Sequence, residues 1–267
     1  MDFEYIDIHS HLYFPDYEND REAEIQKMKE EKVATISIGT NLETSKKCIE
    51  LAEKNENIFA CVGQHPSDLN HKSIFDREII HLTENKKVVA IGETGLDYFR
   101  LPEDSDKIKK IQKEIFEEHI NLSVATGKPL MLHIRPSKNT FDAYLDSLDI
   151  LENKFKEVGE KLKGNAHFFA GDMGILKRFL DIGFTVSFTG VITFTSDYDE
   201  FIKYTPMDKI MSETDSPFVA PVPHRGERNS PLYVKEVVKR MAEIKNLEEG
   251  EAKQKLVSNA IEFFNLN

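Results

Sequence analysis

Short apolar segments recur along the chain, and longer segments with a different hydrophobic spacing separate them. Eight apolar segments lie at residues 5–12, 33–40, 58–66, 88–98, 129–134, 165–171, 184–190 and 209–215. Their length and their β-branched and aromatic residues predict β-strands. Several intervening segments carry apolar residues at about every third or fourth position, which predicts helices. Four of these helical segments span residues 20–31, 44–55, 76–85 and 106–127.

The regular alternation of strands and helices predicts one α/β domain over residues 1–267. Near-continuous apolar strands favour a parallel sheet covered by helices, and eight units indicate a closed (β/α)8 TIM barrel. The competing architecture is a doubly wound open sheet, but no Gly-rich phosphate-binding turn follows the first strand. Segments 230–246 and 248–266 predict two C-terminal helices.

Composition narrows the class of protein. A chain of 267 residues buries a core without disulfides, and the two cysteines, Cys48 and Cys61, lack metal or redox spacing and indicate buried thiols. No apolar stretch is long enough for a membrane helix, and the first residues do not resemble a secretory signal. We therefore expect a cytoplasmic monomer with no membrane partner. The net charge, 35 basic minus 47 acidic residues or −12, argues against broad coating of nucleic acid but allows a local site.

Potential metal ligands stand at the ends of most predicted strands. Asp7, His9 and His11 are spaced two apart, so we expect their side chains to share one face, opposite Ile6 and Ile8. Five more strand-end residues are His65, Glu93, His133, His167, which opens the sixth segment, and Asp215. Because the active site of a TIM barrel lies at the carboxyl ends of its strands, these side chains are predicted to meet around one axis.

Each of these residues also has a purely structural interpretation. Asp215 fits a helix N-cap, and His133 and His167 fit core histidines with satisfied hydrogen bonds. Glu93 is harder to explain in this way, because a lone carboxylate near a barrel axis is costly to bury without a cation. Three histidines lie away from the strand ends and are expected on the surface or in packing: His71, His81 and His119.

Four imidazoles and two carboxylates suffice for two adjacent divalent ions, with one carboxylate bridging and open positions for water and substrate. We expect Asp7 to orient one imidazole of the first strand. Such a site lowers the pKa of bound water and stabilises developing negative charge, which predicts a hydrolase. The histidine-rich shell favours Zn²⁺ or Mn²⁺ as the bound ions, with Mg²⁺ able to support turnover.

Six motifs occur in a fixed order between residues 7 and 231: DIHSHL, GQHP, IGETGLDY, HIR, HFFAG and SETDSPFVAPVPHRGERNSP. Together they resemble the TatD family of metal-dependent deoxyribonucleases, within the amidohydrolase superfamily. The closing NAIEFFNL is similar to the terminal helix of that family. The resemblance implies a TIM barrel and a two-metal hydrolase that acts on DNA, often as a 3′ to 5′ exonuclease on single strands.

The resemblance also assigns ligands residue by residue. It gives the first ion to His9, His11 and Asp215, the second ion to His133 and His167, and makes Glu93 the bridge between them. It places His65 near the ions, either as a phosphate contact or as a residue that hydrogen-bonds to a metal ligand. These assignments agree with the positions of the strand ends.

We expect phosphodiester hydrolysis by a water that the two metals activate, with Glu93 and Asp215 as catalytic residues and Asp215 orienting or deprotonating the water. Guanidinium groups match phosphate oxygens, so the candidate phosphate contacts are Arg135, Arg225 and Arg228. For Arg228 the alternative is a solvated charge on a loop. Tyr98 and Phe99 are candidates for base stacking, with packing at the barrel rim as the alternative.

Two positions depart from the family pattern. Pro136 follows Arg135 where the family usually has an acidic residue, and Glu227 stands where a second basic residue is common. These departures weaken the case for a nucleic-acid substrate more than the case for hydrolysis. The main alternative, which the acidic surface favours, is a metal hydrolase of the same superfamily acting on a small ester, lactone, amide or aminoacyl bond. A barrel that binds metal only for stability, or serves as a scaffold, is the non-enzymatic alternative.

Overall fold

The computed structural model describes residues 2–68, 75–99, 101 and 105–266, and His71 lies outside them. Eight parallel strands form one sheet in chain order. They are β1 Tyr5–Ser10, β2 Val33–Ile38, β3 Ile58–Val62, β4 Val88–Asp97, β5 Leu130–Arg135, β6 Gly164–Ala166, β7 Thr185–Phe188 and β8 Ile210–Ser212. All eight predicted strands are present, and the later ones are shorter than the apolar segments that predicted them.

The two edge strands meet and close the sheet into a TIM barrel. The backbone N–H of Asp215 donates to the carbonyl of His9 at 2.9 Å, and the N–H of His11 donates to the carbonyl of Ser216 at 2.7 Å. The hydroxyl of Ser212 donates to the carbonyl of Ile6 at 3.4 Å. The end of β8 and the residues after it therefore lie along β1, which confirms the predicted barrel.

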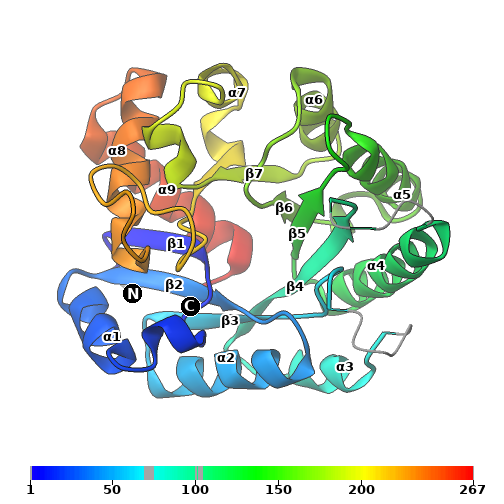
Figure 1. Ribbon diagram of the computed structural model, residues 1–267, viewed down its shortest axis with the longest axis horizontal. Coiled ribbons are helices and arrows are strands. Elements are labelled where there is room, and N and C mark those ends of the chain that lie inside the picture. The colour runs from blue at the N-terminus through cyan, green and yellow to red at the C-terminus, as the bar shows by residue number, and fades with distance from the viewer. Residues whose placement is uncertain (1, 69–74, 100, 102–104, 267) are drawn as a thin grey trace.

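Helices surround the strands, and the last helix passes behind them (Figure 1). They are α1 Arg21–Glu30, α2 Leu42–Lys54, α3 Glu78–Leu82, α4 Asp106–Thr126, α5 Asp142–Val158, α6 Met173–Asp181, α7 Asp199–Tyr204, α8 Val234–Lys245 and α9 Glu249–Phe264. Short 3₁₀ helices are η1 Pro15–Tyr17, η2 Gly159–Lys161, η3 Gly190–Thr193, η4 Met207–Lys209 and η5 Pro231–Tyr233. Within the described residues, no helix combines the length and apolarity needed to cross a bilayer.

Two clusters of buried apolar residues hold the barrel together. The larger cluster joins strand residues to the surrounding helices, as Val33 of β2 and Cys48 of α2 illustrate. The smaller cluster gathers alternate strand residues such as Ile36 and Met131 against Phe264 of α9. Both cysteines are buried free thiols, as the sequence predicted. Some polar residues are buried within the strands as well, as Asn165 and Ser187 show with a hydrogen bond of 2.7 Å.

His119 of α4 is buried and acts in packing, as expected. Its Nδ1 donates to the carbonyl of Ile115 at 2.8 Å, and its Nε2 accepts the backbone N–H of Gln64 at 3.0 Å. Only a neutral imidazole has both a donor and an acceptor nitrogen. Burial lowers the pKa of His119 from 6.5 to about 4, which keeps the ring neutral in the folded protein.

The protonation of His119 predicts a pH-dependent loss of stability. Its pKa is lower in the folded than in the unfolded chain, so its contribution is complete above pH 6.5 and is lost as the pH falls towards 4. The difference in pKa between the folded and the unfolded chain corresponds to about 3 kcal/mol of the free energy of unfolding. We expect His119→Gln to be less stable than the parent protein at pH 8, and the two unfolding free energies, measured in urea, to converge near pH 4. His81→Gln, at an exposed position, is the control and should leave the slope unchanged.

Candidate metal centre

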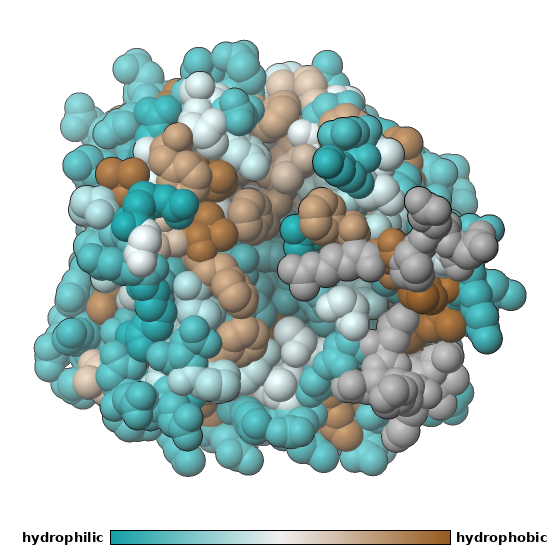
Figure 2. Space-filling view, viewed as in Figure 1, coloured by the Kyte–Doolittle hydropathy of each residue, from teal (hydrophilic) through white to brown (hydrophobic). Residues whose placement is uncertain are grey.

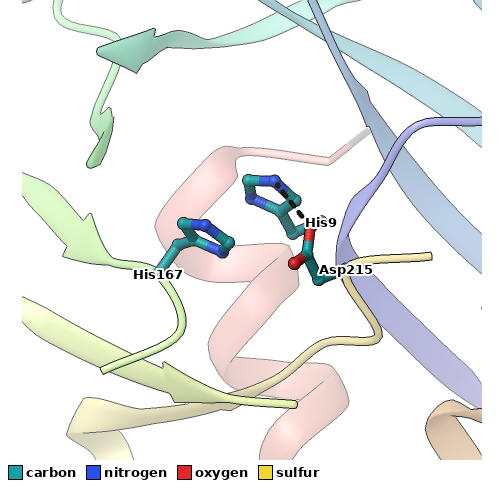
Figure 3. Close-up of side chains that lie close together, drawn as sticks. All are labelled: His9, His167 and Asp215. Atoms are coloured by element: carbon teal, nitrogen blue, oxygen red, sulfur yellow. Dashed lines mark ion pairs between the residues drawn. The ribbon is translucent and has the colours of Figure 1, made fainter. Parts of the chain in front are cut away.

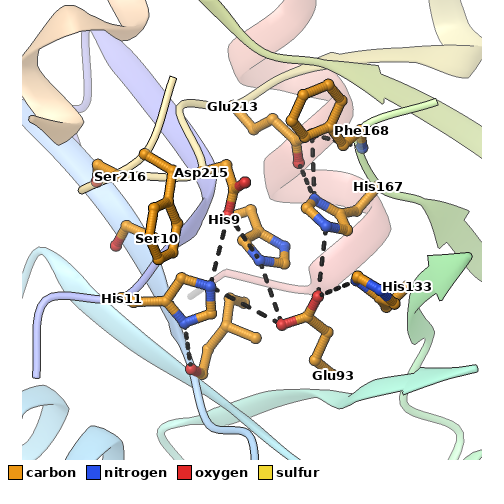
Figure 4. Close-up of polar contacts among 12 residues, drawn as sticks. His9, Ser10, His11, Glu93, His133, His167, Phe168, Glu213, Asp215 and Ser216 are labelled. Carbon is orange, nitrogen blue, oxygen red and sulfur yellow. Dashed lines mark hydrogen bonds and ion pairs between the residues drawn. The ribbon is translucent and has the colours of Figure 1, made fainter. Parts of the chain in front are cut away.

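Histidines and carboxylates from six separate strands meet at one mouth of the barrel, and Figure 4 shows those from β1, β4, β5, β6 and β8. The residues in question are His9 and His11 of the β1 end, His65 after β3, Glu93 of β4, His133 of β5, His167 after β6 and Asp215 after β8. Most of them line a cavity of about 880 Å³. The structure thus brings together all the strand-end residues named from the sequence except Asp7.

One group of donor atoms lies on the β1 side of Glu93. Asp215 Oδ1 is 3.7 Å from His9 Nε2 and 3.5 Å from His11 Nε2. Glu93 Oε2 faces the same two nitrogens at 3.7 and 3.8 Å. Two imidazole nitrogens and two carboxylate oxygens therefore surround one small space, as a divalent cation requires.

A second group lies around the other oxygen of Glu93. Glu93 Oε1 is 3.0 Å from His133 Nδ1, 3.4 Å from His167 Nε2 and 3.7 Å from His65 Nε2. The two oxygens of one carboxylate thus face two different sets of imidazoles. This is the arrangement expected of a carboxylate that bridges two cations.

His167 lies between the two groups. Its ring stacks on that of His9 with centroids 3.7 Å apart and planes at 11°, and Figure 3 shows both rings beside Asp215. The three residues have donor atoms within 4.8 Å of one another, as do His9, His11 and Glu93, and also His65, Glu93 and His133. His167 therefore shares donor space with both groups, which the sequence did not predict.

The second nitrogen of each ring decides which nitrogen presents a lone pair. His11 Nδ1 lies 3.0 Å from the carbonyl of Ile38 and must donate to it, so His11 Nε2 is free to act as a ligand. His167 Nδ1 lies 3.3 Å from Glu213 in the same way. His65 is different, because its Nδ1 accepts the backbone N–H of Ser67 at 3.1 Å. Neutral His65 consequently carries its proton on Nε2 and is a hydrogen-bond donor towards the cavity.

His9 shows that the cluster fits a cation. The ring is fully buried, and neither Nδ1 nor Nε2 has a hydrogen-bond partner among the described residues. A buried, unpaired polar nitrogen is costly, and a cation in the adjacent space would remove that cost at Nε2. The residues present are thus a suitable donor set for divalent ions.

The pKa values of the clustered residues show which of them are charged. Burial alone would raise the pKa of Glu93, but the surrounding His65 and His9 hold it well below its usual range. Burial, followed by repulsion from His167, lowers the pKa of His9 well below 6.5. The Glu93 carboxylate is therefore ionised. Burial alone would lower the pKa of His133 and His167, but the adjacent carboxylates raise the first and hold the second well above 6.5, so both rings release a proton when a cation binds.

Two carboxylates that support the histidines were not identified from the sequence. Asp97 Oδ2 lies 3.1 Å from His133 Nε2, and fully buried Glu213 contacts His167. Glu213 also accepts the N–H of Phe168 at 2.6 Å and the hydroxyl of Ser187 at 3.0 Å. Both belong to motifs quoted above, and Glu213 stands two residues before Asp215. Strand alternation places such residues on one face and was the signal that could have identified Glu213.

The predicted role of Asp7 is wrong. Its carboxylate accepts the N–H and the hydroxyl of Thr214 at 2.8 and 2.6 Å, and the backbone N–H of His9 at 3.1 Å. No imidazole nitrogen is among its hydrogen-bond partners in the described part of the chain. The β1–β2 register shifts after Asp7, so the simple alternation assumed from the sequence does not continue to His9. Asp7 instead ties β1 to the residues after β8.

Local backbone conformation directs several cavity residues. Phe168, Asp215 and Val219 have φ values of 45°, 55° and 50°, in the left-handed region that residues other than glycine rarely adopt. The turn at Phe168 explains why β6 ends before His167, so that His167 follows this strand and does not open it, contrary to the prediction. Backbone strain of this kind is commonly concentrated at functional sites.

Gly95 allows β4 to approach β5 behind the cluster. It pairs with His133 in the sheet and has a φ of 138°. A Cβ atom at Gly95 would lie 2.1 Å from the carbonyl oxygen of His133, which is backbone and can move only with its strand. The glycine in this motif is thus required by the close approach of two strands.

We expect Gly95→Ala to destabilise the protein by about 2–4 kcal/mol, because the methyl group forces β4 and β5 apart. Urea denaturation of metal-free protein measures this loss. Gly250→Ala is the matched control, since a Cβ there meets nothing within 4 Å and alanine favours the helix. Equal stability of the parent and the Gly95→Ala protein would contradict the steric explanation.

The three arginines proposed as phosphate contacts differ in availability. Arg135 lies over the ring of Phe99 at 4.0 Å and lines the cavity. Arg225 lies over the ring of Phe194 at 4.0 Å and donates to the carbonyl of Ala220. Arg228 forms two hydrogen bonds with Asp20, at 2.7 and 2.8 Å, so it is neither a free loop charge nor an available phosphate ligand.

The aromatic residues after Glu93 also differ from each other. Tyr98 is buried and donates its hydroxyl to Asp146 at 2.9 Å, so it packs at the rim and does not stack on a substrate. Phe99 is 46% exposed under the guanidinium of Arg135. Pro136, one of the two departures from the family pattern, lines the cavity beside Arg135.

The barrel and the cluster at its mouth define the class of protein, a TIM-barrel hydrolase that depends on metal. The chain belongs to the TatD related DNase family, whose model matches residues 6–265. It is 35% identical over 267 residues to the uncharacterized metal-dependent hydrolase YabD of Bacillus subtilis, covering 98% of this chain and 99% of that protein. It is 34% identical over 270 residues to the uncharacterized metal-dependent hydrolase YcfH of Escherichia coli, covering 98% and 96%.

A solved structure supports the same assignment. The crystal structure of YJJV, a TatD homolog from Escherichia coli, matches with a TM-score of 0.84 and 25% identity, covering 99% of each chain. The TatD family protein of Entamoeba histolytica shares the fold, with a TM-score of 0.81 at 24% identity. The family resemblance inferred from the six motifs is thereby confirmed.

Proposed function

We propose that this protein is a deoxyribonuclease that removes nucleotides from the 3′ end of single-stranded DNA. The observation that carries the proposal is the double role of Glu93, whose two oxygens face two separate sets of imidazoles. The family description, TatD related DNase, supports DNA as the substrate. A pair of cations about one carboxylate suits phosphodiester hydrolysis, in which both the attacking and the leaving oxygen carry charge.

In this proposal His9, His11 and Asp215 hold one ion, His133 and His167 hold the other, and Glu93 bridges them. When bound, the ions lower the pKa of a water molecule and neutralise charge on the phosphate. Their identity is part of the proposal: the imidazoles favour Zn²⁺ or Mn²⁺, and Mg²⁺ supports turnover. Elemental analysis of protein purified without chelator tests it.

The chain's own residues position the substrate and move protons. Asp215 accepts a proton from the attacking water as the water oxygen bonds to phosphorus and the bond from phosphorus to the leaving oxygen breaks. Asp215 then returns this proton to the leaving oxygen, which departs as a hydroxyl group. His65, whose pKa is lowered to about 3 mainly by burial, stays neutral and donates its Nε2–H to a phosphate oxygen. Arg135 binds a neighbouring phosphate.

The second candidate function is hydrolysis of a small ester, lactone, amide or aminoacyl bond. The cavity favours it through its apolar wall, formed by Phe14, Ile134, Pro136, Phe168 and Phe218. Among its described lining residues, Arg135 is the sole arginine or lysine. A long polyanion would find few cations there.

One activity screen separates the two candidates. Metal-reconstituted protein is assayed on single-stranded DNA, duplex DNA, RNA and small phosphate and carboxyl esters. We expect single-stranded DNA to be hydrolysed fastest and in a salt-dependent manner. Hydrolysis of a carboxyl ester without hydrolysis of any oligonucleotide would contradict the proposal and support the alternative.

A further inference from the structure

The aromatic ring of Phe218 is partly exposed to solvent beside the candidate metal centre. The residue is 49% exposed and lines the same cavity as His11 and Asp215. Its ring centroid lies 5.7 Å from that of Phe14, at an interplanar angle of 84°, and 6.3 Å from that of His11. The edge-on contact with Phe14 supports the Phe218 ring without covering all of it.

The backbone of Phe218 is fixed as well. Its N–H donates to the carbonyl of Asp215 at 2.9 Å, and its own carbonyl accepts from the side chain of fully buried Asn229 at 2.5 Å. Asn229 also donates to the carbonyl of Thr214 at 2.9 Å. The ring is therefore held in a defined position relative to the cluster, although nothing in the described chain buries it.

Two further apolar side chains are exposed on the segments that follow β7 and β8. Phe194 is 43% exposed and Val222 is 45% exposed, and the N–H of Val222 donates to the hydroxyl of Thr193 at 2.9 Å. Figure 2 shows a band of apolar side chains across the face of the molecule that it draws. A rigid apolar surface beside hydrolytic residues is suited to hold part of a substrate.

Apart from the ions that the metal centre would hold, positively charged groups at this mouth are scarce. Arg135 and Arg225 have no carboxylate partner among the described residues, whereas Arg228 is paired with Asp20. Two available guanidinium groups neutralise about two phosphates, too few to bind a strand through its backbone alone. Affinity must then come from the bases, and an aromatic ring binds any unpaired base through its face.

We infer that Phe218 is the stacking site for an unpaired base next to the bond that is hydrolysed, and that stacking contributes more to affinity than ion pairing does. The inference rests on the proposed function. It also accounts for selectivity, since a base within a duplex is already stacked and paired and does not present its face to Phe218.

The test measures binding of a single-stranded oligonucleotide of about eight nucleotides with phosphorothioate linkages to Mn²⁺-loaded protein. Fluorescence anisotropy at several salt concentrations gives the affinity. We expect Phe218→Ala to bind about 10-fold more weakly at every salt concentration, and Phe218→Trp to restore binding. The logarithm of the affinity should fall with the logarithm of salt at a slope of about −1.4, as two phosphate contacts require, in both the parent and Phe218→Ala. Tyr204→Ala, which removes a 50% exposed ring at the end of α7, should bind like the parent.

An oligonucleotide with an abasic site beside its 3′ end separates stacking from a general effect on the fold. The parent protein should lose about 10-fold in affinity for it, and Phe218→Ala should lose nothing further. Unchanged binding by Phe218→Ala, or equal losses of both proteins on the abasic strand, would overturn the stacking site while leaving the proposed nuclease intact. Failure of the parent protein to bind or cleave any oligonucleotide would instead overturn the proposed function itself.

Discussion

Glu93→Gln is expected to bind at most one divalent ion per chain and to lose more than about 100-fold of its hydrolytic rate. The glutamine keeps the shape of the side chain but removes the negative charge shared by both sets of imidazoles. One amide oxygen cannot face both sets as the carboxylate does, so at least one set loses its oxygen ligand. Mutation of a residue that only hydrogen-bonds to a metal ligand typically lowers metal affinity or activity by about 10–100-fold. We therefore expect a larger loss when a ligand shared by both ions is changed.

Elemental analysis and the rate on the best substrate measure the two effects of Glu93→Gln. The matched control is Glu24→Gln, because Glu24 is also buried but its partner is Ser230, away from the cluster. The control should keep both ions and the full rate. Two bound ions and an unchanged rate in the Glu93→Gln protein would show that Glu93 does not bridge.

Glu213→Gln is expected to weaken binding of one of the two ions by about 10–100-fold and to leave the other unaffected. The Glu213 carboxylate holds the proton of His167 on Nδ1, which leaves the lone pair on Nε2, 3.4 Å from Glu93. A glutamine amide can turn its NH₂ group towards Nδ1, and the proton then moves to Nε2 and blocks the ligand atom. Isothermal titration of metal-free protein with Mn²⁺ resolves the two affinities.

The control for Glu213→Gln is Asp7→Asn. Asp7 is equally buried at the same end of the barrel, but its hydrogen bonds go to Thr214 and to the backbone of His9. We expect Asp7→Asn to lower the free energy of unfolding by about 1–3 kcal/mol without changing either metal affinity. If Asp7→Asn weakened metal binding and Glu213→Gln did not, the assignment of the supporting carboxylate would be reversed.

The sequence predicted the barrel well because the patterns that identify strands and helices lie within short segments of the chain. Each strand is a run of buried apolar residues, and each helix has its own spacing, so the order of elements could be read without knowing any long-range contact. The same logic placed His9, Glu93, His133 and Asp215 at one mouth, since all parallel strands end there. The limits of single elements were less certain, as the early end of β6 before His167 illustrates.

The partners of the site residues were predicted less well. Alternation suggested Asp7 as the group that orients an imidazole, but its carboxylate is bound by Thr214, which follows the neighbouring strand β8 where the barrel closes. For Arg228 the sequence left open a phosphate contact or a solvated loop charge, and only the fold showed that Asp20, at the start of α1, is hydrogen-bonded to it. Hydrogen bonds between residues about 200 positions apart leave no periodic trace in the chain.

The sequence by itself determined the class of fold, the family and the set of side chains that gather at the mouth, because these follow from residue spacing and from the common end of parallel strands. The tertiary structure decided how those side chains are used. It showed that Glu93 faces two sets of imidazoles, that Glu213 and Asp97 support His167 and His133, and that His65 presents a proton and not a lone pair. The physical reason is that a lone pair, a proton or an open ring face depends on contacts within about 4 Å, and closure of the barrel brings those contacts together from strands far apart in the chain.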